Sequence, residues 1–161
     1  MSKTPTHCPF CDLIQGAAEV SVCYEDATAL AFLDIQPVND GHVLVVPREH
    51  YERLEDVPSD VGRHLYDVTI KLIPVIQQVT GTEDMNIVVS SGTAAGQDVF
   101  HYHVHLIPRR AGDGNEISLP FSGSEMPDRT RLDAMAARIG AVTRDPMRTT
   151  APRPPGSIAA A

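Results

Sequence analysis

Five short segments of the chain have the apolar, β-branched composition that is typical of strands. The run at residues 42–47 is almost continuously apolar and ends at Pro47, which cannot donate to a sheet ladder, so it predicts a central strand. Asp40-Gly41, just before it, is a strong turn signal. The pattern predicts strands over residues 22–26, 28–33, 42–47, 86–90 and 99–108.

One long amphipathic helix is predicted from Ser59 to Thr80. Pro58, Ser59 and Asp60 are typical of a capped helix start. Pro74 predicts a kink, and Gly81 predicts the end of the helix. Its apolar stripe consists of Val61, Leu65, Val68, Leu72, Val75, Ile76 and Val79.

Two further helical segments are predicted. A single turn after Cys11 closes at Gly16, and a second helix runs from Asp128 to Thr143 with Asp128 as its cap. The apolar face of this second helix consists of Leu132, Met135, Ala136 and Ile139. Together the elements predict an α+β fold with an antiparallel sheet of about five strands, one long helix and a C-terminal helix.

Composition and charge narrow the classes of partner. The chain has 161 residues, of which 42% are hydrophobic, enough for one domain with a core. A formal charge of −8 gives no net field to attract nucleic acid. No signal peptide and no apolar run long enough to span a membrane is apparent, and three cysteines argue against a disulfide framework. We therefore expect a cytoplasmic protein without a nucleic-acid or membrane partner.

Three histidines alternate with apolar residues in the last predicted strand. His101, His103 and His105 occupy positions i, i+2 and i+4, so they project from one face, with backbones about 6.6 Å apart. Neutral imidazole is a nucleophile near neutral pH and can attack phosphorus to form a covalent intermediate. The small-residue loop from Gly92 to Gln97 could bring backbone N–H groups close to phosphate oxygens.

This run resembles the hallmark of the histidine triad (HIT) family, in which three histidines alternate with apolar residues. It stands here as His101-Tyr102-His103-Val104-His105-Leu106-Ile107. Residues 32–37, 41–50 and 95–100 also resemble the family, and the motifs come in the family's order. The likeness implies a HIT domain at 8–110. Composition outside it predicts a flexible N-terminus at 1–7, a C-terminal extension with a helix at 111–144, and a disordered tail at 145–161 with little to bury.

Known members of the family bind nucleotides and cleave at the α-phosphate through a nucleotidyl-histidine. The resemblance therefore implies a hydrolase or nucleotidyl transferase with a purine nucleotide substrate. The expected substrate is a nucleoside phosphoramidate or a dinucleoside polyphosphate, cleaved at a phosphorus–nitrogen or phosphoanhydride bond. The resemblance also implies a homodimer.

The resemblance assigns roles to individual residues. His103 would be the nucleophile, His105 would bind the phosphate, and His101 would orient the site. Asp34 would accept hydrogen bonds from the ribose. The phosphate or leaving group would be held by Gln97 and by the backbone of Asp98 and Val99. The base would lie among Phe10, Leu13, Phe32, Ile35 and Leu44, whose alternative role is simply to form the core.

Two positions depart from the family's pattern. Ser90 stands where relatives often carry Asn beside the nucleotide, and Asp98 stands where a hydroxyl side chain is common. A carboxylate beside a phosphate is electrostatically unfavourable. We hypothesise on charge alone that Asp98 faces a leaving group that carries an amine.

A structural zinc site is predicted near the N-terminus. Cys8 and Cys11 have the C-x2-C spacing of zinc knuckles, and a closed tetrahedral site needs two more ligands. Similar pairs in bacterial relatives bind zinc, which implies His50 and His101 as the other ligands. His7 is a competing ligand, and a pair of free thiols is the alternative. Cys23 is expected to pack as a small hydrophobic residue.

Two other functions remain open from the sequence. In one, His101, His103 and His105 bind a catalytic metal, although no carboxylate follows them closely. In the other, the chain is a non-catalytic nucleotide-binding or adaptor protein, which the presence of His103 disfavours. Triad chemistry should survive EDTA if the fold holds, whereas a catalytic-metal enzyme should not.

Overall fold

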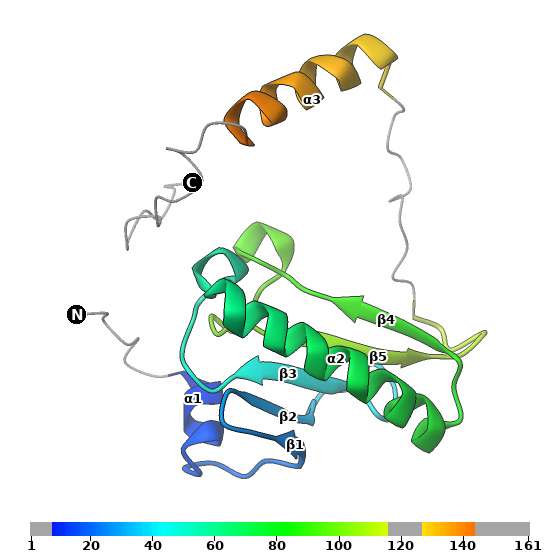
Figure 1. Ribbon diagram of the computed structural model, residues 1–161. Helices are drawn as coiled ribbons and strands as arrows, with labels where there is room; N and C mark the ends of the chain where they lie inside the picture. The colour runs from blue at the N-terminus through cyan, green and yellow to red at the C-terminus, as the bar shows by residue number, and fades with distance from the viewer. Residues whose placement is uncertain (1–7, 116–126, 144–161) are drawn as a thin grey trace. The chain divides into compact units, whose positions relative to one another are not determined.

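A five-stranded antiparallel sheet organises the chain. The computed structural model describes residues 8–115 and 127–143. The strands run in the order β1-β2-β3-β5-β4 (Figure 1). This arrangement, with one long helix and a C-terminal helix, confirms the predicted α+β class. The strand bounds are β1 Val22–Glu25, β2 Ala29–Leu33, β3 Val43–Pro47, β4 Asp84–Val88 and β5 Val104–Arg109.

The last strand is shorter than the sequence predicted. We expected residues 99–108, but β5 begins at Val104, so His101 and His103 precede the paired strand. The register pairs Val45 with Val104 and, if continued, would place Pro47 opposite Tyr102. Pro47 has no N–H to donate, and the amide of Tyr102 instead donates to the carbonyl of Tyr51 across 2.6 Å. The pairing of β3 with β5 therefore ends at Val104, so His105 lies within the paired strand while His101 and His103 precede it.

The long helix α2 has the predicted bounds, Ser59–Thr80. Gly81 ends it in the left-handed conformation, as expected. The expected side-chain cap at its start is wrong, because Pro58 occupies the cap position and no side chain caps the first turn. Pro at the edge of a helix fixes φ without sacrificing a helical hydrogen bond, and the carbonyl of Pro58 accepts the amide of Gly62 across 2.8 Å. The other helices are α1 Pro9–Ile14, α3 Arg129–Thr143, and the 3-10 turns η1 Leu54–Asp56 and η2 Thr93–Ala95.

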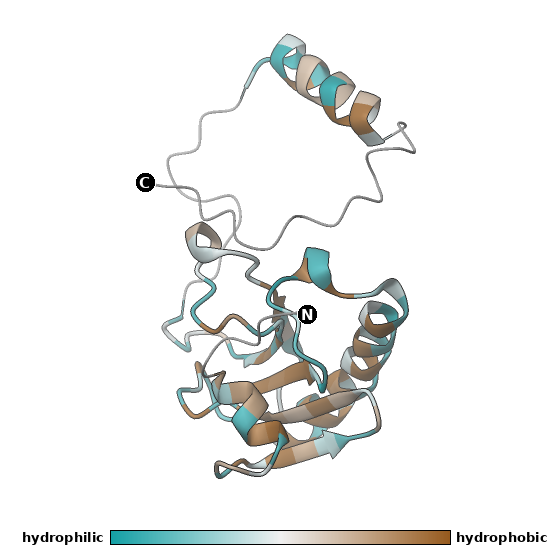
Figure 2. Ribbon diagram, turned by 90° about the vertical axis from the view of Figure 1, so that its left-hand side faces the viewer, coloured by the Kyte–Doolittle hydropathy of each residue, from teal (hydrophilic) through white to brown (hydrophobic). Residues whose placement is uncertain are grey.

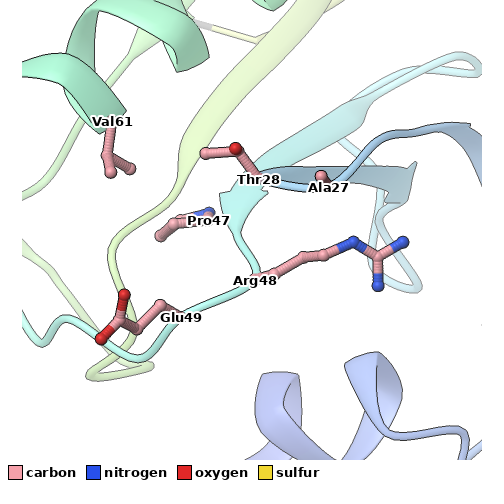
Figure 3. Close-up of a pocket in the computed structure, with 6 residues that line it drawn as sticks. All are labelled: Ala27, Thr28, Pro47, Arg48, Glu49 and Val61. Atoms are coloured by element: carbon pink, nitrogen blue, oxygen red, sulfur yellow. The ribbon is translucent and has the colours of Figure 1, made fainter.

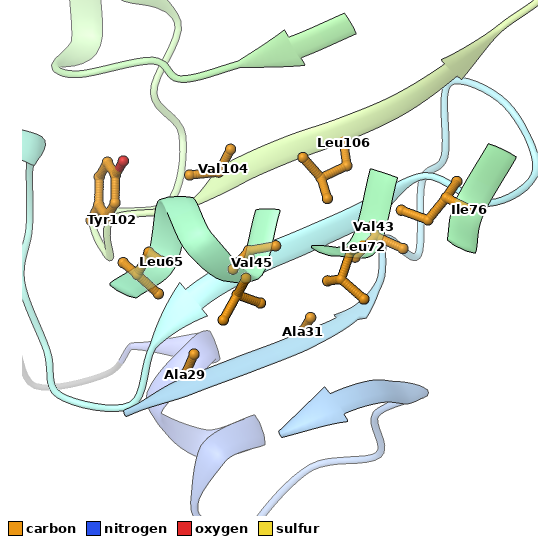
Figure 4. Packing of buried hydrophobic residues seen from close by; sticks show 11 residues of the cluster. Ala29, Ala31, Val43, Val45, Leu65, Leu72, Ile76, Tyr102, Val104 and Leu106 are labelled. Atoms are coloured by element: carbon orange, nitrogen blue, oxygen red, sulfur yellow. The ribbon is translucent and has the colours of Figure 1, made fainter. Parts of the chain in front are cut away.

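The two faces of the sheet carry different clusters, because alternate strand residues point to opposite sides. Helix α2 covers one face (Figure 4). The apolar residues gather in the strands, and α2 alternates apolar with polar positions (Figure 2). The cluster beneath α2 consists of Ala29, Ala31, Val43, Val45, Leu65, Val68, Leu72, Ile76, Tyr102, Val104 and Leu106. The cluster on the α1 face consists of Cys8, Phe10, Leu30, Phe32, Leu44 and Val46.

The turn before β3 packs tightly against the end of α2. Gly41 has φ +89°, and a Cβ there would lie 2.5 Å from Thr80 Cγ2. Only glycine fits both the backbone conformation and the space. The turn delivers the next residue, His42, to the start of β3 and buries it.

The chain divides into two units, Met1–Ile117 and Ser118–Ala161. In the second unit, Asp128 Oδ1 accepts the amide of Arg131 across 2.7 Å, which confirms Asp128 as the cap of α3. The predicted flexible N-terminus at 1–7 and disordered tail at 145–161 lie outside the described residues. Among the described helices, none combines the length and apolar character that a membrane crossing requires.

Candidate functional site

His103 is oriented by the backbone of the residue two positions before it. Its Nδ1 lies 2.7 Å from the carbonyl oxygen of His101, and a carbonyl can only accept, so Nδ1–H donates. In the neutral ring the lone pair is then on Nε2, which makes Nε2 the nucleophilic atom. The side chain is buried, and its ring centroid lies 4.8 Å from that of His105. The sequence placed these two imidazoles on one face, and the structure brings them together.

A hydrogen-bond relay fixes the protons on His42 and His105. The amide of Val38 donates to His42 Nδ1 across 3.1 Å, so the proton of the neutral His42 ring is on Nε2. His42 Nε2 lies 3.0 Å from His105 Nδ1 and therefore donates to it. His105 then carries its own proton on Nε2, where it is available to a phosphate oxygen.

Burial keeps both rings of the relay neutral. Desolvation, followed by the repulsion that a charged His105 would meet from His103 and His42 in their protonated forms, lowers the pKa of His105 to about 4. Desolvation also lowers the pKa of His42, against the opposing effect of the Asp34 carboxylate. Near neutral pH, His105 therefore acts as a hydrogen-bond donor rather than as a cation.

Asp34, His42 and His105 offer ligand atoms within 4.8 Å of one another, the spacing of a cation site. The tautomers favour a relay instead. A cation on His42 Nε2 would move that proton to Nδ1, where it would oppose the amide of Val38. Asp34 Oδ2 lies 3.6 Å from His42 Nε2, and Asp34 Oδ1 accepts the amide of Gln36. The carboxylate thus stands beside the relay, and its contact with a ribose stays a prediction.

The four predicted metal ligands do converge. Cys8, Cys11, His50 and His101 place one ligand atom each within 4.8 Å of one another. His101 Nδ1 lies 3.6 Å from both sulfur atoms, and His50 Nδ1 lies 3.4 Å from Cys11 Sγ. A tetrahedral zinc ion with bonds of about 2.0–2.3 Å puts a thiolate and an imidazole nitrogen roughly 3.6 Å apart, so the spacing matches.

The hydrogen bonds around this cluster also fit a metal. His101 Nε2–H donates to the carbonyl of Pro47 across 2.8 Å, which leaves Nδ1 unprotonated toward the sulfur atoms. Burial, only partly offset by this bond, lowers the pKa of His101 to about 4. His50 turns Nδ1 toward Cys11 Sγ at 3.4 Å, while its Nε2, the other ring nitrogen, is buried without a hydrogen-bond partner among the described residues. The residues therefore fit a structural zinc ion.

Most of the predicted base-binding residues lie on the α1 face of the sheet. Phe10, Phe32 and Leu44 belong to the buried cluster there, and Leu13 and Val99 pack against it. The Phe10 ring meets that of His103 edge-on, with centroids 5.3 Å apart. Ile35 differs, because 94% of its surface is exposed. Phe32 and Leu44 are thus packed as core residues, Ile35 is exposed to solvent, and a contact of these side chains with a base stays a prediction.

Gln97 braces the loop rather than presenting a free amide. Its Oε1 accepts the amide of Gly92, and its Nε2 donates to the carbonyls of Glu52 and Val99. The side chain is buried. A direct bond from Gln97 to phosphate stays a prediction that would require one of these bonds to break.

The two positions that depart from the family pattern, Asp98 and Ser90, both reach solvent. Asp98 is exposed, and its Oδ1 accepts the amide of Val99 across 2.8 Å. The Asp98 carboxylate thus accepts the hydrogen bond of the Val99 amide, which we expected to bind phosphate. Ser90 follows β4 by two residues and is half-buried.

A small pocket elsewhere on the protein is not the candidate site. It holds about 160 Å³ and lies between the end of β3 and the start of α2 (Figure 3). Its only cation, Arg48, extends away from Pro47 and Val61 and donates to Glu25 and to the carbonyl of Asp26. None of the triad histidines lines it, so it offers no reacting group to a nucleotide.

His42 is the functional residue that the sequence analysis missed. A lone histidine at the start of an apolar strand gives little signal by itself. Its position opposite the triad could have been found from the strand pairing, because its neighbours Val43 and Leu44 pair with Leu106 and His105.

Comparisons with known proteins agree with this geometry. The HIT domain model matches residues 15–112. An uncharacterised HIT-like protein of Methanocaldococcus jannaschii is 44% identical over 110 residues, covering 68% of this chain and 84% of that protein. A protein of Arabidopsis thaliana named as an adenylylsulfatase is 38% identical over 112 residues, covering 70% of this chain and 57% of that protein.

A solved structure shares the fold. The crystal structure of a zinc-bound histidine triad family protein from Mycobacterium smegmatis has a TM-score of 0.63 and 33% identity, over 83% of this chain and 96% of that one. The family model covers more than half of the chain, and it includes the histidine row, the relay and two of the four metal-site residues. The chain therefore belongs to the histidine triad (HIT domain) family.

Proposed function

We propose that this protein is a nucleotide hydrolase or nucleotidyl transferase that acts at the α-phosphate through a covalent nucleotidyl-His103 intermediate. The observation that carries the proposal is the hydrogen bond from His103 Nδ1 to the carbonyl of His101, which leaves Nε2 as the nucleophile. The name of the Arabidopsis relative, an adenylylsulfatase, supports chemistry on an adenylyl group.

In the first step, the Nε2 lone pair of His103 attacks the α-phosphorus. A phosphorus–nitrogen bond forms, and the bond to the leaving group breaks with its electron pair on the leaving group. The imidazole gains positive charge, which the carbonyl of His101 stabilises through Nδ1–H. His105 donates its Nε2–H to a phosphate oxygen, held in that tautomer by His42. Water then attacks phosphorus and loses a proton to solvent, and the phosphorus–nitrogen bond breaks with its electron pair returning to Nε2. This step releases the nucleoside monophosphate and restores neutral His103.

The substrate would be a purine nucleoside phosphoramidate or a dinucleoside polyphosphate. The base would lie on the α1 face near Phe10 and Leu13, with Ile35 at its exposed edge. Asp34 would accept the ribose hydroxyls with Oδ2, since Oδ1 is already bonded to the Gln36 amide.

Zinc would be held by Cys8, Cys11, His50 and His101 in a closed site, where it supplies structural rigidity and no chemistry on the substrate. The ring of His101 is then committed to the metal and to Pro47, which leaves the chemistry to His103 and His105.

We also propose that a HIT domain at 8–110, with a C-terminal extension, acts as a cytoplasmic homodimer. Support comes from β4, which lies at an edge of the sheet formed by the described strands, and from exposed apolar residues on α2 such as Tyr66, Ile70 and Val79. Large exposed apolar residues beside an open strand edge are typical of a homodimer surface.

The test compares the wild type with His103→Ala on an adenosine phosphoramidate and on a diadenosine polyphosphate, with AMP release as the readout and no added metal. His64→Ala is the matched control, because His64 pairs with Asp26 on the other side of the sheet. We expect activity in the wild type and the control, and none in His103→Ala. Equal activity in all three proteins would remove His103 from its role, and nucleotide binding without turnover would indicate a binding protein.

A further inference from the structure

The predicted zinc site touches the proposed nucleophile through the peptide group of His101. The ring of His101 faces both sulfur atoms at 3.6 Å, and its carbonyl oxygen accepts Nδ1–H of His103 at 2.7 Å. His101 is fully buried and is also bound to Pro47 at the end of β3. One residue thus supplies a predicted metal ligand through its ring and, through its backbone, the acceptor that orients His103.

A second contact comes from Phe10, one of the two residues between the cysteines. Phe10 meets His103 edge-on, with an interplanar angle of 89°, and also contacts the rings of His101 and Phe32 at 5.9 Å and 5.4 Å. Helix α1, which carries Phe10, has only six residues. A helix of that length is not stable alone, so its position depends on tertiary anchors. The cysteines that flank Phe10 supply such an anchor when they bind a metal.

We propose that the metal-bound segment Cys8–Cys11 positions the nucleophile, and that Phe10 is a positioning residue for the His103 ring rather than only part of a base pocket. This inference rests on the proposed function of His103 and on zinc at the four ligands. The metal would hold the ring of His101, whose carbonyl accepts Nδ1–H of His103, and the segment that carries Phe10, whose ring meets that of His103 edge-on. Loss of either support lets the ring rotate about its side-chain bonds, so Nε2 no longer faces phosphorus.

The first measurement removes zinc and follows three quantities: kcat, the dissociation constant of AMP, and the imidazole Nδ1–H proton resonance of His103. A small displacement of a reacting atom can cost about 100-fold in rate, so we expect kcat to fall by about that factor while AMP affinity changes by less than about threefold. The resonance should be sharp in the loaded protein and lost to solvent exchange in the metal-free protein. Unchanged kcat and an unchanged resonance in a metal-free protein would overturn the proposal.

The second measurement uses a zinc-loaded variant, so its result can be interpreted even if the metal-free chain unfolds. Phe10→Leu should still bind one zinc ion per chain, which metal analysis checks. A positioning role predicts a lower kcat with little change in KM and a weakened resonance. A role only in base binding predicts a higher KM with kcat unchanged, which would contradict the proposal. Cys23→Ser, which alters a thiol outside the cluster, is the control and should match the wild type.

The two hypotheses fail differently. If the loaded wild type forms no nucleotidyl-histidine, the proposed function is wrong, yet the Nδ1–H resonance still reports whether the metal orients the ring. If the covalent intermediate forms equally fast with and without zinc, the function stands and the positioning role is wrong.

Discussion

His103 Nδ1 and the carbonyl oxygen of His101 lie 2.7 Å apart, so the backbone of one triad residue orients the side chain of another. The carbonyl stabilises positive charge on the ring only if His103 gains that charge during the reaction. The bond is therefore worth more in the transition state than in the resting enzyme.

The relay predicts that His42 contributes to turnover although it is two hydrogen bonds away from the substrate. In His42→Ala, His105 Nδ1 loses its donor, so the ring can adopt the tautomer that has no Nε2–H. We expect kcat to fall by about 100-fold, a loss comparable to that of a proton-transfer group. Steady-state kinetics beside His64→Ala, with zinc content measured in both, checks this. Equal kcat in the two variants would contradict the relay.

Stability should depend on pH through His105. The folded pKa is about 4, because burial and the neighbouring histidines disfavour the charged ring, whereas the unfolded value is near 6.5. Between these values the unfolded chain binds a proton that the folded chain does not. The free energy of unfolding therefore falls as pH drops from about 6.5 to about 4, and His105 adds no further change below that.

Urea unfolding at several pH values, in the wild type and in His105→Gln, measures this effect as a difference. The variant lacks the titrating ring, so its stability should fall less over the same interval. Parallel curves for the two proteins would show that His105 has an ordinary pKa.

Gly41→Ala should destabilise the fold. Alanine is strained at φ +89°, and its Cβ would lie 2.5 Å from Thr80 Cγ2. We expect a loss of about 2 kcal/mol or more in the free energy of unfolding. Gly62→Ala is the matched control. Its Cβ meets only Val57 Cγ1, at 3.8 Å, and lies within α2, where alanine is stabilising by about 0.5–1 kcal/mol. Urea unfolding should show opposite signs for the two variants.

Asp98 should set the preference between leaving groups. Its exposed carboxylate repels a leaving group that carries phosphate and attracts one that carries an amine. Asp98→Ser should therefore lower the ratio of kcat/KM for a cationic phosphoramidate to kcat/KM for a diadenosine polyphosphate. Asp40→Ser, at an exposed turn, is the comparison. An unchanged ratio would contradict the hypothesis that Asp98 faces an amine on the leaving group.

Zinc removal should lower stability as well as activity. We expect one zinc per chain, about half an ion or less in Cys8→Ser, and a full complement in Cys23→Ser. Burial and the neighbouring Cys8 raise the pKa of Cys11 to about 11, so zinc binding must release thiol protons. Calorimetry in buffers of different ionisation enthalpy would measure this release. Wild-type zinc content in Cys8→Ser would place the metal elsewhere.

Much of the fold follows from local patterns. The 3.6-residue stripe and Gly81 predicted the bounds of α2, and Asp128 was correctly identified as a cap. The start of β5 was missed because it depends on a partner: Pro47, on a different strand, ends the ladder. The periodicity of one segment cannot reveal whether the strand beside it has a backbone N–H to donate to the ladder.

The candidate site, like the fold, could be predicted from local sequence only in part. The spacing of the histidines and cysteines indicated which residues would gather, and the structure brings the four metal-site residues together. The tautomers were beyond prediction, because they depend on contacts such as the one between His101 and Pro47, 54 positions apart. The relay required Gly41 to bring its turn against α2 before His42 could reach His105.

The relay begins at the amide of Val38, a main-chain group. Such a group has no titration in the physiological range and survives every substitution except proline. The tautomers of His42 and His105 are thus set by a backbone amide, which the path of the chain places, and not by a further side chain. A substitution of Val38 by any residue other than proline keeps the amide, and so keeps the tautomers of His42 and His105.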